Sequence, residues 1–233
     1  MKLLAAYQTG WGRGPASRVH FGALSGGIRW RREAPCACRL RAMTGQIEFG
    51  LGKGKVFPHE KAGSLLNPVR RLIQSPGKVV RWVGLRGDEQ VLELGCGPGY
   101  FSLAFRDATP HGRLVLFDLQ PEMLQMARER VGRKSAVTLA AGNAMALPFR
   151  TGTFDVVFIA AVLGEVPDRQ RCLEEVRRVL RPGGRLVVNE VRGDPDYIKA
   201  SGLDGLCASA GLVLRRRWNG RVRWTCLSEY AGG

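Results

Sequence analysis

The sequence predicts an α/β fold with a doubly wound, seven-stranded and mostly parallel sheet. Between residues 90 and 190, short apolar runs alternate with amphipathic helical segments, which is the pattern of a parallel sheet with helices on both faces. Two more strand-like runs near the end of the chain flank a turn signal and predict a C-terminal antiparallel hairpin. A chain of 233 residues, 45% of them hydrophobic, is long enough to bury such a core.

Residues 1–45 differ in composition from the rest of the chain. They hold eight of the 36 basic residues and one of the 20 acidic residues, they are rich in glycine, and they show neither a helical nor a strand period. We interpret them as a disordered basic tail of a cytoplasmic protein. An arginine-rich, acid-poor beginning is also typical of organellar transit peptides, so targeting to an organelle is the alternative.

Residues 46–86 are expected to form a helical preface, or lid, in front of the sheet. A first apolar stripe consists of Leu65, Leu66, Val69, Leu72 and Ile73. A second helix is expected to begin at Ser75-Pro76, because serine is a common N-cap and proline is favoured at the first helical position. Its stripe is Val79, Val80 and Val83, and Gly84 ends it.

The predicted core occupies residues 87–233. Its parallel strands are expected at Gln90–Leu94, Arg113–Asp118, Val137–Ala140, Val156–Ala160 and Arg185–Glu190. The helices between them are expected near Tyr100–Arg106, Pro121–Val131 and Arg169–Leu180. The last two strands are Leu212–Trp218 and Arg221–Leu227, and Asn219-Gly220 between them predicts a two-residue turn.

A glycine-rich turn follows the first core strand, where Gly95, Gly97 and Gly99 alternate with other residues. Glycines allow a sharp turn and a close approach to a ligand, at the sheet edge where doubly wound folds bind nucleotides. Asp118 ends the second strand, where a carboxylate can accept hydrogen bonds from both ribose hydroxyls. These features indicate a nucleoside cofactor. Tyr100 stands where the dinucleotide fingerprint requires glycine, which weakens a pyrophosphate-binding interpretation.

Five motifs occur in order along this core: Glu93 to Tyr100, Phe117 to Leu124, Ala141 to Phe149, Phe154 to Val157, and Leu180 to Gly184. With them the chain resembles the class I S-adenosylmethionine-dependent methyltransferases, in particular the group that includes the ubiquinone and menaquinone biosynthesis methyltransferases. The resemblance covers Phe57 to Leu227. It implies a Rossmann-like methyltransferase fold for residues 87–233, S-adenosyl-L-methionine as the cofactor, and methyl transfer as the activity.

The resemblance also implies roles for individual residues. Glycines 95, 97 and 99 would line the methionine and ribose part of the cofactor, and Glu93 would help to hold its amino group. Asp118 would bind the ribose and Leu119 would cover one face of the adenine. The adenine edge would be read by Asn143 and the amide of Ala144, and the backbone of Ala160 would face the methionine. These residues are Glu93, Gly95, Gly97, Gly99, Asp118, Leu119, Asn143, Ala144 and Ala160.

Two positions depart from the family pattern. Asn143 stands where the family often has Asp, which keeps an acceptor oxygen but removes a charge. Gly164 stands where many relatives have His, so we expect the substrate side of the pocket to have lost a histidine. Neither departure removes a group that cofactor binding requires.

Glu165 is the best-placed candidate for a catalytic residue, because it follows the fourth strand and is expected near the transferred methyl group. A methyltransferase mainly aligns its donor and acceptor, and it needs a base only if the acceptor must lose a proton. A solvated carboxylate at a helix start is the alternative interpretation of Glu165. Weaker candidates are His59 and Glu60 in the helical preface. Asp194, Asp196 and Tyr197 follow the fifth strand and could contact the substrate, and a simple loop turn at residues 193–196 is the alternative.

The formal net charge of +16 favours anionic partners, and 28 basic against 19 acidic residues remain after residue 45. Arginine and tryptophan alternate near the C-terminus, at Arg215, Arg216, Arg217, Trp218, Arg221, Arg223 and Trp224. Arginines beside aromatic residues are used to hold nucleic acid, so an RNA methyltransferase is one alternative. The other interpretation is a solvated hairpin whose charges prevent edge pairing, and we expect that one.

A small-molecule methyl acceptor is therefore the expected substrate. The alternatives are RNA and a non-catalytic protein that retains the cofactor fold. The six cysteines and three histidines form no recognisable metal-binding pattern, and no membrane-spanning run is expected. Cys36 and Cys38 alone suggest an arsenic methyltransferase, and we discount them because they lie in the tail.

Overall fold

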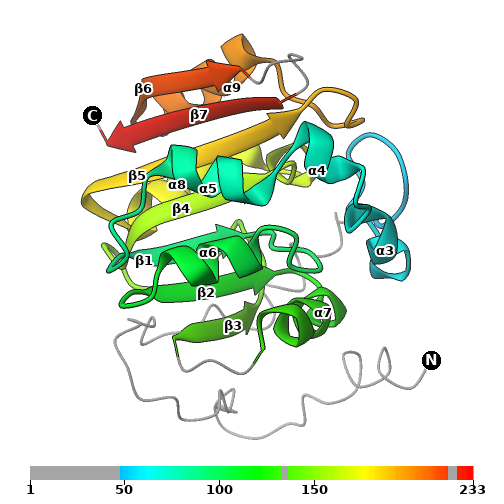
Figure 1. The fold of residues 1–233 in the computed structure, drawn as a ribbon. Helices are drawn as coiled ribbons and strands as arrows, with labels where there is room; N and C mark the ends of the chain where they lie inside the picture. Colours follow the sequence, from blue (N-terminus) through cyan, green and yellow to red (C-terminus); the bar gives the residue numbers. More distant parts are fainter. Residues whose placement is uncertain (1–47, 133–135, 220–224, 233) are drawn as a thin grey trace, which may run out of the picture.

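A computed structural model describes residues 48–132, 136–219 and 225–232. They form one seven-stranded sheet in the order β3-β2-β1-β4-β5-β7-β6. The strands are β1 Gln90–Leu94, β2 Arg113–Asp118, β3 Val137–Ala141, β4 Phe154–Ala160, β5 Leu180–Val191, β6 Leu212–Asn219 and β7 Thr225–Gly232. Strands β1 to β5 pair in parallel, and β7 pairs antiparallel to both β5 and β6. The predicted sheet is confirmed (Figure 1).

Helices cover both faces of the sheet (Figure 1). Helices α5 (Pro76–Val83), α6 (Ser102–Ala108) and α7 (Pro121–Val131) pack on one face, and α8 (Arg169–Val179) and α9 (Ala200–Ser209) pack on the other. Helix α9 has no counterpart among the predicted helices. It contains Gly202 and Gly205, and two of its residues, Leu203 and Cys207, are buried, so its apolar stripe is too narrow to stand out.

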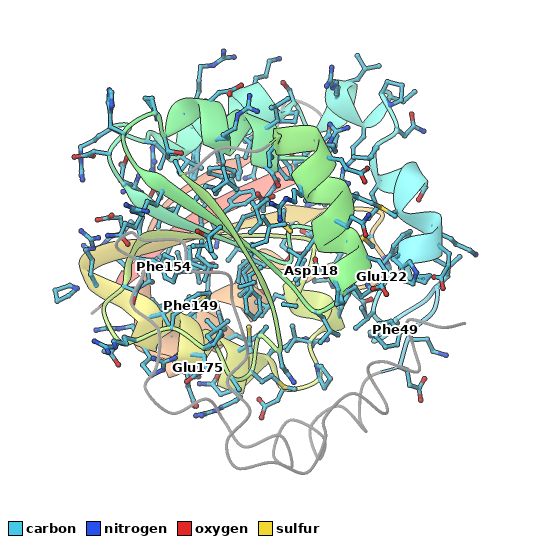
Figure 2. All side chains as sticks on the ribbon, turned by 90° about the horizontal axis from the view of Figure 1, so that it is seen from below. Phe49, Asp118, Glu122, Phe149, Phe154 and Glu175 are labelled. Atoms are coloured by element: carbon cyan, nitrogen blue, oxygen red, sulfur yellow. The ribbon has the colours of Figure 1, made fainter. Side chains whose placement is uncertain are left out.

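The strands contribute alternate side chains to two apolar clusters, one on each face of the sheet. Leu92 of β1 belongs to the cluster under α8 and α9, whereas its neighbour Val91 belongs to the cluster under α5 to α7. Figure 2 shows Phe149 and Phe154 together on the α8 side, where their ring centroids are 5.0 Å apart. The sheet is thus buried on both sides, and its strand ends are free to build a site.

Strands β4 and β5 begin earlier in the chain than predicted. Strand β4 begins at Phe154 and β5 at Leu180, because these two residues pair with each other before a register shift. The sequence analysis predicted only Arg185–Glu190 as strand here, and it placed Leu180 at the end of the preceding helix.

The predicted two-residue turn at Asn219-Gly220 is wrong. A two-residue turn at these positions would pair Trp218 with residue 221. Trp218 instead pairs with Leu227, and Asn219 pairs with Cys226, so β6 and β7 are not joined by that turn. The described part of β7 begins at Thr225. The predicted strand residues Arg221 and Arg223 lie outside the described part of the chain.

The segment before β1 forms short helices, namely η1 (His59–Lys61), α3 (Ala62–Leu65), α4 (Arg70–Ile73) and α5. Ser75-Pro76 begins α5, and Gly84 ends it with a φ of 67°, as predicted. The stripe from Leu65 to Ile73 is wrong as a buried face, because Val69 is 58% and Leu72 is 86% exposed. Pro68 separates the two short helices that share the stripe.

No helix in the described part of the chain has the length and apolar character that crossing a membrane requires. The basic segment 1–45, with Cys36 and Cys38, lies outside the described residues. Its predicted disorder and the targeting alternative therefore stay predictions.

Candidate functional site

A cavity of about 770 Å³ opens at the carboxyl ends of the central strands. Its floor consists of residues at the ends of β1 to β5 and just after them, and its roof consists of residues between Gly50 and Gln74. This is the edge at which doubly wound sheets bind their ligands. Eight of the nine residues that the resemblance proposes for the cofactor line this cavity, namely Glu93, Gly95, Gly97, Asp118, Leu119, Asn143, Ala144 and Ala160.

The glycine-rich turn needs glycine for different reasons at each position. Gly95 and Gly97 have φ values of 71° and 53°, which other residues rarely adopt. A Cβ at Gly95 would lie 2.4 Å from Cγ2 of Val162, whereas at Gly97 only Cδ1 of Leu65, at 3.9 Å, is within 4 Å. The backbone at Gly97 is therefore open toward the cavity.

Gly99 does not line the cavity. Its φ is 85°, and a Cβ there would lie 2.9 Å from Cα of Ala127 in α7. This glycine allows the turn to pack against a helix, so its position is explained without a ligand.

Asp118 lies at the end of β2, beside the start of α7 where Glu122 is located (Figure 2). The backbone N–H of Gly97 donates to Oδ2 at 2.8 Å, and that of Gln120 donates to Oδ1 at 2.9 Å. The carboxylate is 7% exposed, and this burial raises its pKa despite the backbone hydrogen bonds. Each oxygen retains a lone pair for a further donor.

Glu93 lies at the end of β1 and is 3% exposed. The hydroxyl of Ser102 donates to its Oε2 at 2.7 Å. Burial, together with the charge of Asp118, raises the pKa of Glu93 to about 8. A cation in the cavity would favour the ionised form of this side chain.

Asn143 follows β3 and is buried at 4% exposure. Its Oδ1 accepts a hydrogen bond from the backbone N–H of Met145 at 2.8 Å, whereas its Nδ2 has no hydrogen-bond partner among the described residues. Ala144 and Leu119 line the same part of the cavity. An unpaired buried donor is costly, so this end of the cavity has spare hydrogen-bonding capacity for a polar ligand.

Glu165 ends the short helix η2 (Leu163–Glu165) and lines the cavity. Glu165 is partly buried, and its Oε2 accepts a hydrogen bond from the backbone N–H of Phe57 in the roof at 3.2 Å. Burial raises the pKa of Glu165 to about 8, with additional contributions from the charges of Asp194, Asp196 and Asp118. A carboxyl group with such a pKa can hold or release a proton near neutral pH.

The chain is strained just after β4. Ala161 has a φ of 52°, and its N–H donates to the carbonyl of Asn189 at 3.0 Å. It is the one non-glycine residue with positive φ in the described part of the chain, and it lines the cavity beside Ala160. Strained residues of this kind often occur at ligand sites.

Gly164 stands against the loop that follows β5. A Cβ on Gly164 would lie 2.2 Å from the carbonyl oxygen of Asp196. The space that a histidine side chain would need is therefore occupied by this loop, which brings Asp194 and Asp196 to the cavity. Asp194 also forms a local turn, because its Oδ1 accepts the N–H of Asp196 at 2.8 Å. Tyr197 does not line the cavity.

The roof is tied to the floor by polar contacts. The N–H of Gly54 donates to Oδ1 of Asp196 at 2.7 Å, and the side chain of Gln120 bonds to the backbone of both Phe57 and His59. Neither His59 nor Glu60 lines the main cavity. The described residues contain no group of three or more potential metal ligands.

Sequence reasoning missed three residues of the cavity wall, namely Arg70, Gln74 and Tyr100. The guanidinium of Arg70 lies 4.4 Å from the centroid of the Tyr100 ring, and the Tyr100 hydroxyl donates to the Gln74 carbonyl at 2.8 Å. These residues are separated by up to 30 positions in the chain, and Arg70 is followed directly by another arginine. No local sequence signal therefore distinguishes Arg70 as the arginine of the cavity wall.

Two arginines of the C-terminal hairpin are used inside the fold. Arg216 lies over the Trp82 ring, 4.2 Å from its centroid, and pairs with Glu229 at 2.8 Å. Arg217 donates to Asp204 and pairs with it on the opposite face of the sheet. These two neighbouring arginines therefore lie on opposite faces of the sheet, and each is paired with a carboxylate.

Comparison with known proteins agrees with this geometry. Residues 92–188 match the family described as "Methyltransferase domain". The demethylmenaquinone methyltransferase of Lactiplantibacillus plantarum is 37% identical over 118 residues, which is 49% of each chain. The ubiquinone/menaquinone biosynthesis C-methyltransferase of Hahella chejuensis is 37% identical over 131 residues, which is 54% of this chain and 53% of that protein. The chain thus spans about half the length of these relatives.

A solved S-adenosylmethionine-dependent methyltransferase from Aquifex aeolicus shares the fold. It superposes with a TM-score of 0.70 at 22% identity, over 75% of this chain and 98% of that one. Residues 92–188 are thus similar to a methyltransferase domain, and the fold is that of the class I, S-adenosylmethionine-dependent methyltransferases. The cofactor of this family is S-adenosylmethionine, and the open backbone at Gly97, the lone pairs of Asp118 and the unpaired donor of Asn143 fit such a nucleoside.

Proposed function

We propose that this protein transfers a methyl group from S-adenosylmethionine to a small-molecule acceptor that binds beneath the roof of the cavity. The observation that carries the proposal is the cavity itself, in which eight residues proposed for the cofactor and the carboxyl group of Glu165 face one space of about 770 Å³. A space of this size exceeds what a single nucleoside fills and leaves room for a small acceptor.

The cofactor, when bound, supplies an electrophilic methyl group on its sulfonium. The chain's residues have the tasks of holding the two reactants in line and excluding water. Asp118 holds the ribose, Glu93 and the turn at Gly95 and Gly97 hold the methionine part, and Asn143 with Ala144 and Leu119 holds the adenine. Residues 46–86 act as the lid, because segments of this region form the roof of the cavity.

Glu165 is the proposed general base. Its carboxyl group is at the roof–floor junction, where it accepts the N–H of Phe57, and its pKa of about 8 leaves part of the population ionised near neutral pH. An ionised Glu165 can take a proton from a hydroxyl, amine or activated carbon as the methyl group is transferred.

The apolar residues of the roof favour an acceptor with an apolar body. They are Leu51, Val56, Phe57, Leu65 and Val69. The similar proteins named for demethylmenaquinone and for ubiquinone/menaquinone biosynthesis support a small organic acceptor of this kind. An RNA acceptor has less support, since Arg216 and Arg217 are paired within the hairpin.

The test is a methyl-transfer assay with methyl-labelled S-adenosylmethionine and a bacterial extract separated into an RNA fraction and an organic-solvent fraction. We expect protein-dependent label in the organic-solvent fraction, and no label when Asp118→Ala replaces the wild type. Label that appears in the RNA fraction alone would overturn the small-molecule assignment.

A further inference from the structure

Arg70 is a positively charged side chain in the cavity wall, and among the described residues it forms no ion pair. Its hydrogen bonds go to the uncharged groups of Gln74 and Leu65, although Asp194 is near enough to influence its charge. The side chain is partly buried in the wall, and this burial lowers its pKa. A partly desolvated charge is normally compensated by an ion of opposite sign.

The guanidinium is held in a fixed orientation. Its Nε donates to Oε1 of Gln74 at 2.9 Å, its Nη1 donates to the carbonyl of Leu65 at 3.0 Å, and its plane lies over the Tyr100 ring. No hydrogen bond of Nη2 is recorded among the described residues. An arginine that is already oriented loses little entropy when it binds a planar, two-oxygen group.

Gln74 adds a second donor at the same place. It is 2% exposed and lines the cavity, and its Nε2 has no partner among the described residues. Because its Oε1 is bonded to Arg70, its unpaired amide hydrogens lie directly beside the guanidinium. A buried amide that lacks a partner costs free energy, which an oxygen-bearing ligand would recover.

The position of this pair relative to the turn indicates what it binds. Tyr100, on which Arg70 lies, directly follows the glycine-rich turn, and Leu65, which accepts from Arg70, is the residue nearest to the open side of Gly97. Asn143, Asp118, Gly97, Arg70 and Gln74 all line the same cavity. We infer that Arg70 and Gln74 form a carboxylate-binding subsite at this end of the cavity.

Two carboxylates could occupy the subsite, namely that of the cofactor's methionine part or one carried by the methyl acceptor. The inference rests on the proposed function in placing both molecules in this cavity. If the cofactor supplies the carboxylate, its binding draws the lid segment that carries Arg70 and Gln74 onto the ligand. If the acceptor supplies it, the subsite selects acidic acceptors.

The test compares binding of S-adenosylhomocysteine with binding of its decarboxylated analogue, by calorimetry, in the wild type and in Arg70→Met. The matched control is Arg71→Met, because Arg71 is exposed and does not line the cavity. If the cofactor is the source, the wild type prefers S-adenosylhomocysteine by about tenfold or more, and Arg70→Met but not Arg71→Met loses that preference. Gln74→Met leaves Arg70 in place, so this variant should lose only part of the preference for S-adenosylhomocysteine.

A second arm identifies an acceptor carboxylate, with benzoate titrated into protein saturated with S-adenosylhomocysteine. Binding of benzoate to the wild type and to Arg71→Met, but not to Arg70→Met, would assign the subsite to the acceptor. If Arg70→Met changes neither the preference nor benzoate binding, the inference is overturned. If Arg70→Met does not fold, two other variants test the carboxylate subsite. Arg70→Lys keeps the positive charge but lacks the paired N–H groups of the guanidinium, and Gln74→Met removes the amide donor. Failure of the wild type to bind either nucleoside would instead refute the proposed function.

Discussion

The backbone N–H of Gly97 donates a hydrogen bond to Oδ2 of Asp118 at 2.8 Å, so the turn after β1 is fixed directly to the end of β2. The two residues are 21 positions apart, and both line the cavity. Asp118 thus has a structural task as well as the ribose-binding task proposed for it. Variants at this position must separate the two tasks.

Replacement of Asp118 by alanine should weaken S-adenosylhomocysteine binding by about a hundredfold, since it removes a charged acceptor for two hydroxyl groups. It should also lower the free energy of unfolding by about 1 to 3 kcal/mol, because the N–H groups of Gly97 and Gln120 lose their partner. Calorimetry and urea unfolding measure the two effects. Asp118→Asn keeps an acceptor oxygen and should lose less of both, and normal binding by Asp118→Ala would refute the assignment.

The charge state of Glu165 should control how well the protein distinguishes S-adenosylmethionine from S-adenosylhomocysteine. The pKa of Glu165 is raised to about 8, so the side chain is neutral at lower pH and becomes an anion as the pH rises. An anion in the cavity attracts the sulfonium charge, which only the methyl donor carries. The affinity ratio of donor to product should therefore rise about three- to tenfold between about pH 6 and about pH 9.

Glu165→Gln is the control for this effect, because glutamine retains an oxygen that can accept the N–H of Phe57 but does not ionise. Its affinity ratio should rise less than that of the wild type over the same pH range, and the remaining rise belongs to Glu93, which lines the same cavity and also has a pKa of about 8. A pH-independent ratio in the wild type would exclude Glu165 as a charge near the sulfonium.

Glu93 should make the folded protein less stable at alkaline pH. Its pKa is raised from 4.5 to about 8 on folding, so the folded state binds the proton more tightly than the unfolded state. This contribution to stability is complete below pH 4.5 and disappears as the pH rises through about 8. Between about pH 5 and about pH 9, the wild type should lose about 4 kcal/mol more of its free energy of unfolding than Glu93→Gln, since roughly three pH units separate pH 5 from the pKa and each is worth roughly 1.4 kcal/mol. Urea unfolding at the two pH values measures this difference. Parallel pH curves for the two proteins would contradict the burial argument.

A side chain at Gly164 should disrupt the loop after β5. A Cβ there would lie 2.2 Å from the Asp196 carbonyl and 2.5 Å from its Cβ, so the loop must move. We expect Gly164→Ala to lower the free energy of unfolding by about 2 kcal/mol. Gly205→Ala in α9, where a Cβ would meet no atom within 4 Å, is the control and should be neutral or stabilising. Equal stability of the two variants would mean that the loop does not occupy this space.

The hairpin arginines should act on stability rather than on nucleic acid. Arg217 bonds to Asp204, which also accepts the Tyr230 hydroxyl at 2.7 Å, and to Ser228. Arg217→Ala should lower the melting temperature and cost about 1 to 3 kcal/mol, whereas exposed Arg215→Ala should change stability by less than about 0.5 kcal/mol. Salt-dependent RNA binding in the wild type that Arg217→Ala abolishes without loss of stability would favour an RNA acceptor instead.

The parallel part of the fold was predictable because each strand and helix carries its own periodic pattern. Helix α7 occurs at the predicted bounds, Pro121–Val131, and β1 and β2 do so as well. The errors arose where a local signal competes with pairing partners far away in the chain. Asn219-Gly220 has the chemistry of a tight turn, but the pairing of Asn219 with Cys226 sets a different register.

The candidate site was predictable where function depends on a short motif, as at Gly97 and Asp118. It was not predictable where the residues meet through the fold, as at Arg70 and Gln74. Leu72 belongs to an apolar stripe that the sequence predicted as one helix face, and yet it is exposed. The stripe is divided between two helices of four residues each, so its residues do not share one face. The register of paired strands, the residues that line the cavity and the contacts of the lid all depend on which distant segments lie close together in space. A single sequence does not reveal these long-range contacts.

The central claim is that the cavity above β1, β2 and β4 binds S-adenosylmethionine. The most direct test is calorimetric titration of the purified protein with S-adenosylmethionine, S-adenosylhomocysteine and NADH in parallel. The account predicts micromolar or tighter binding of both sulfur nucleosides, about 8 kcal/mol or more of binding free energy, and no binding of NADH. Binding of NADH alone would contradict it and would place the chain among the dinucleotide-dependent oxidoreductases.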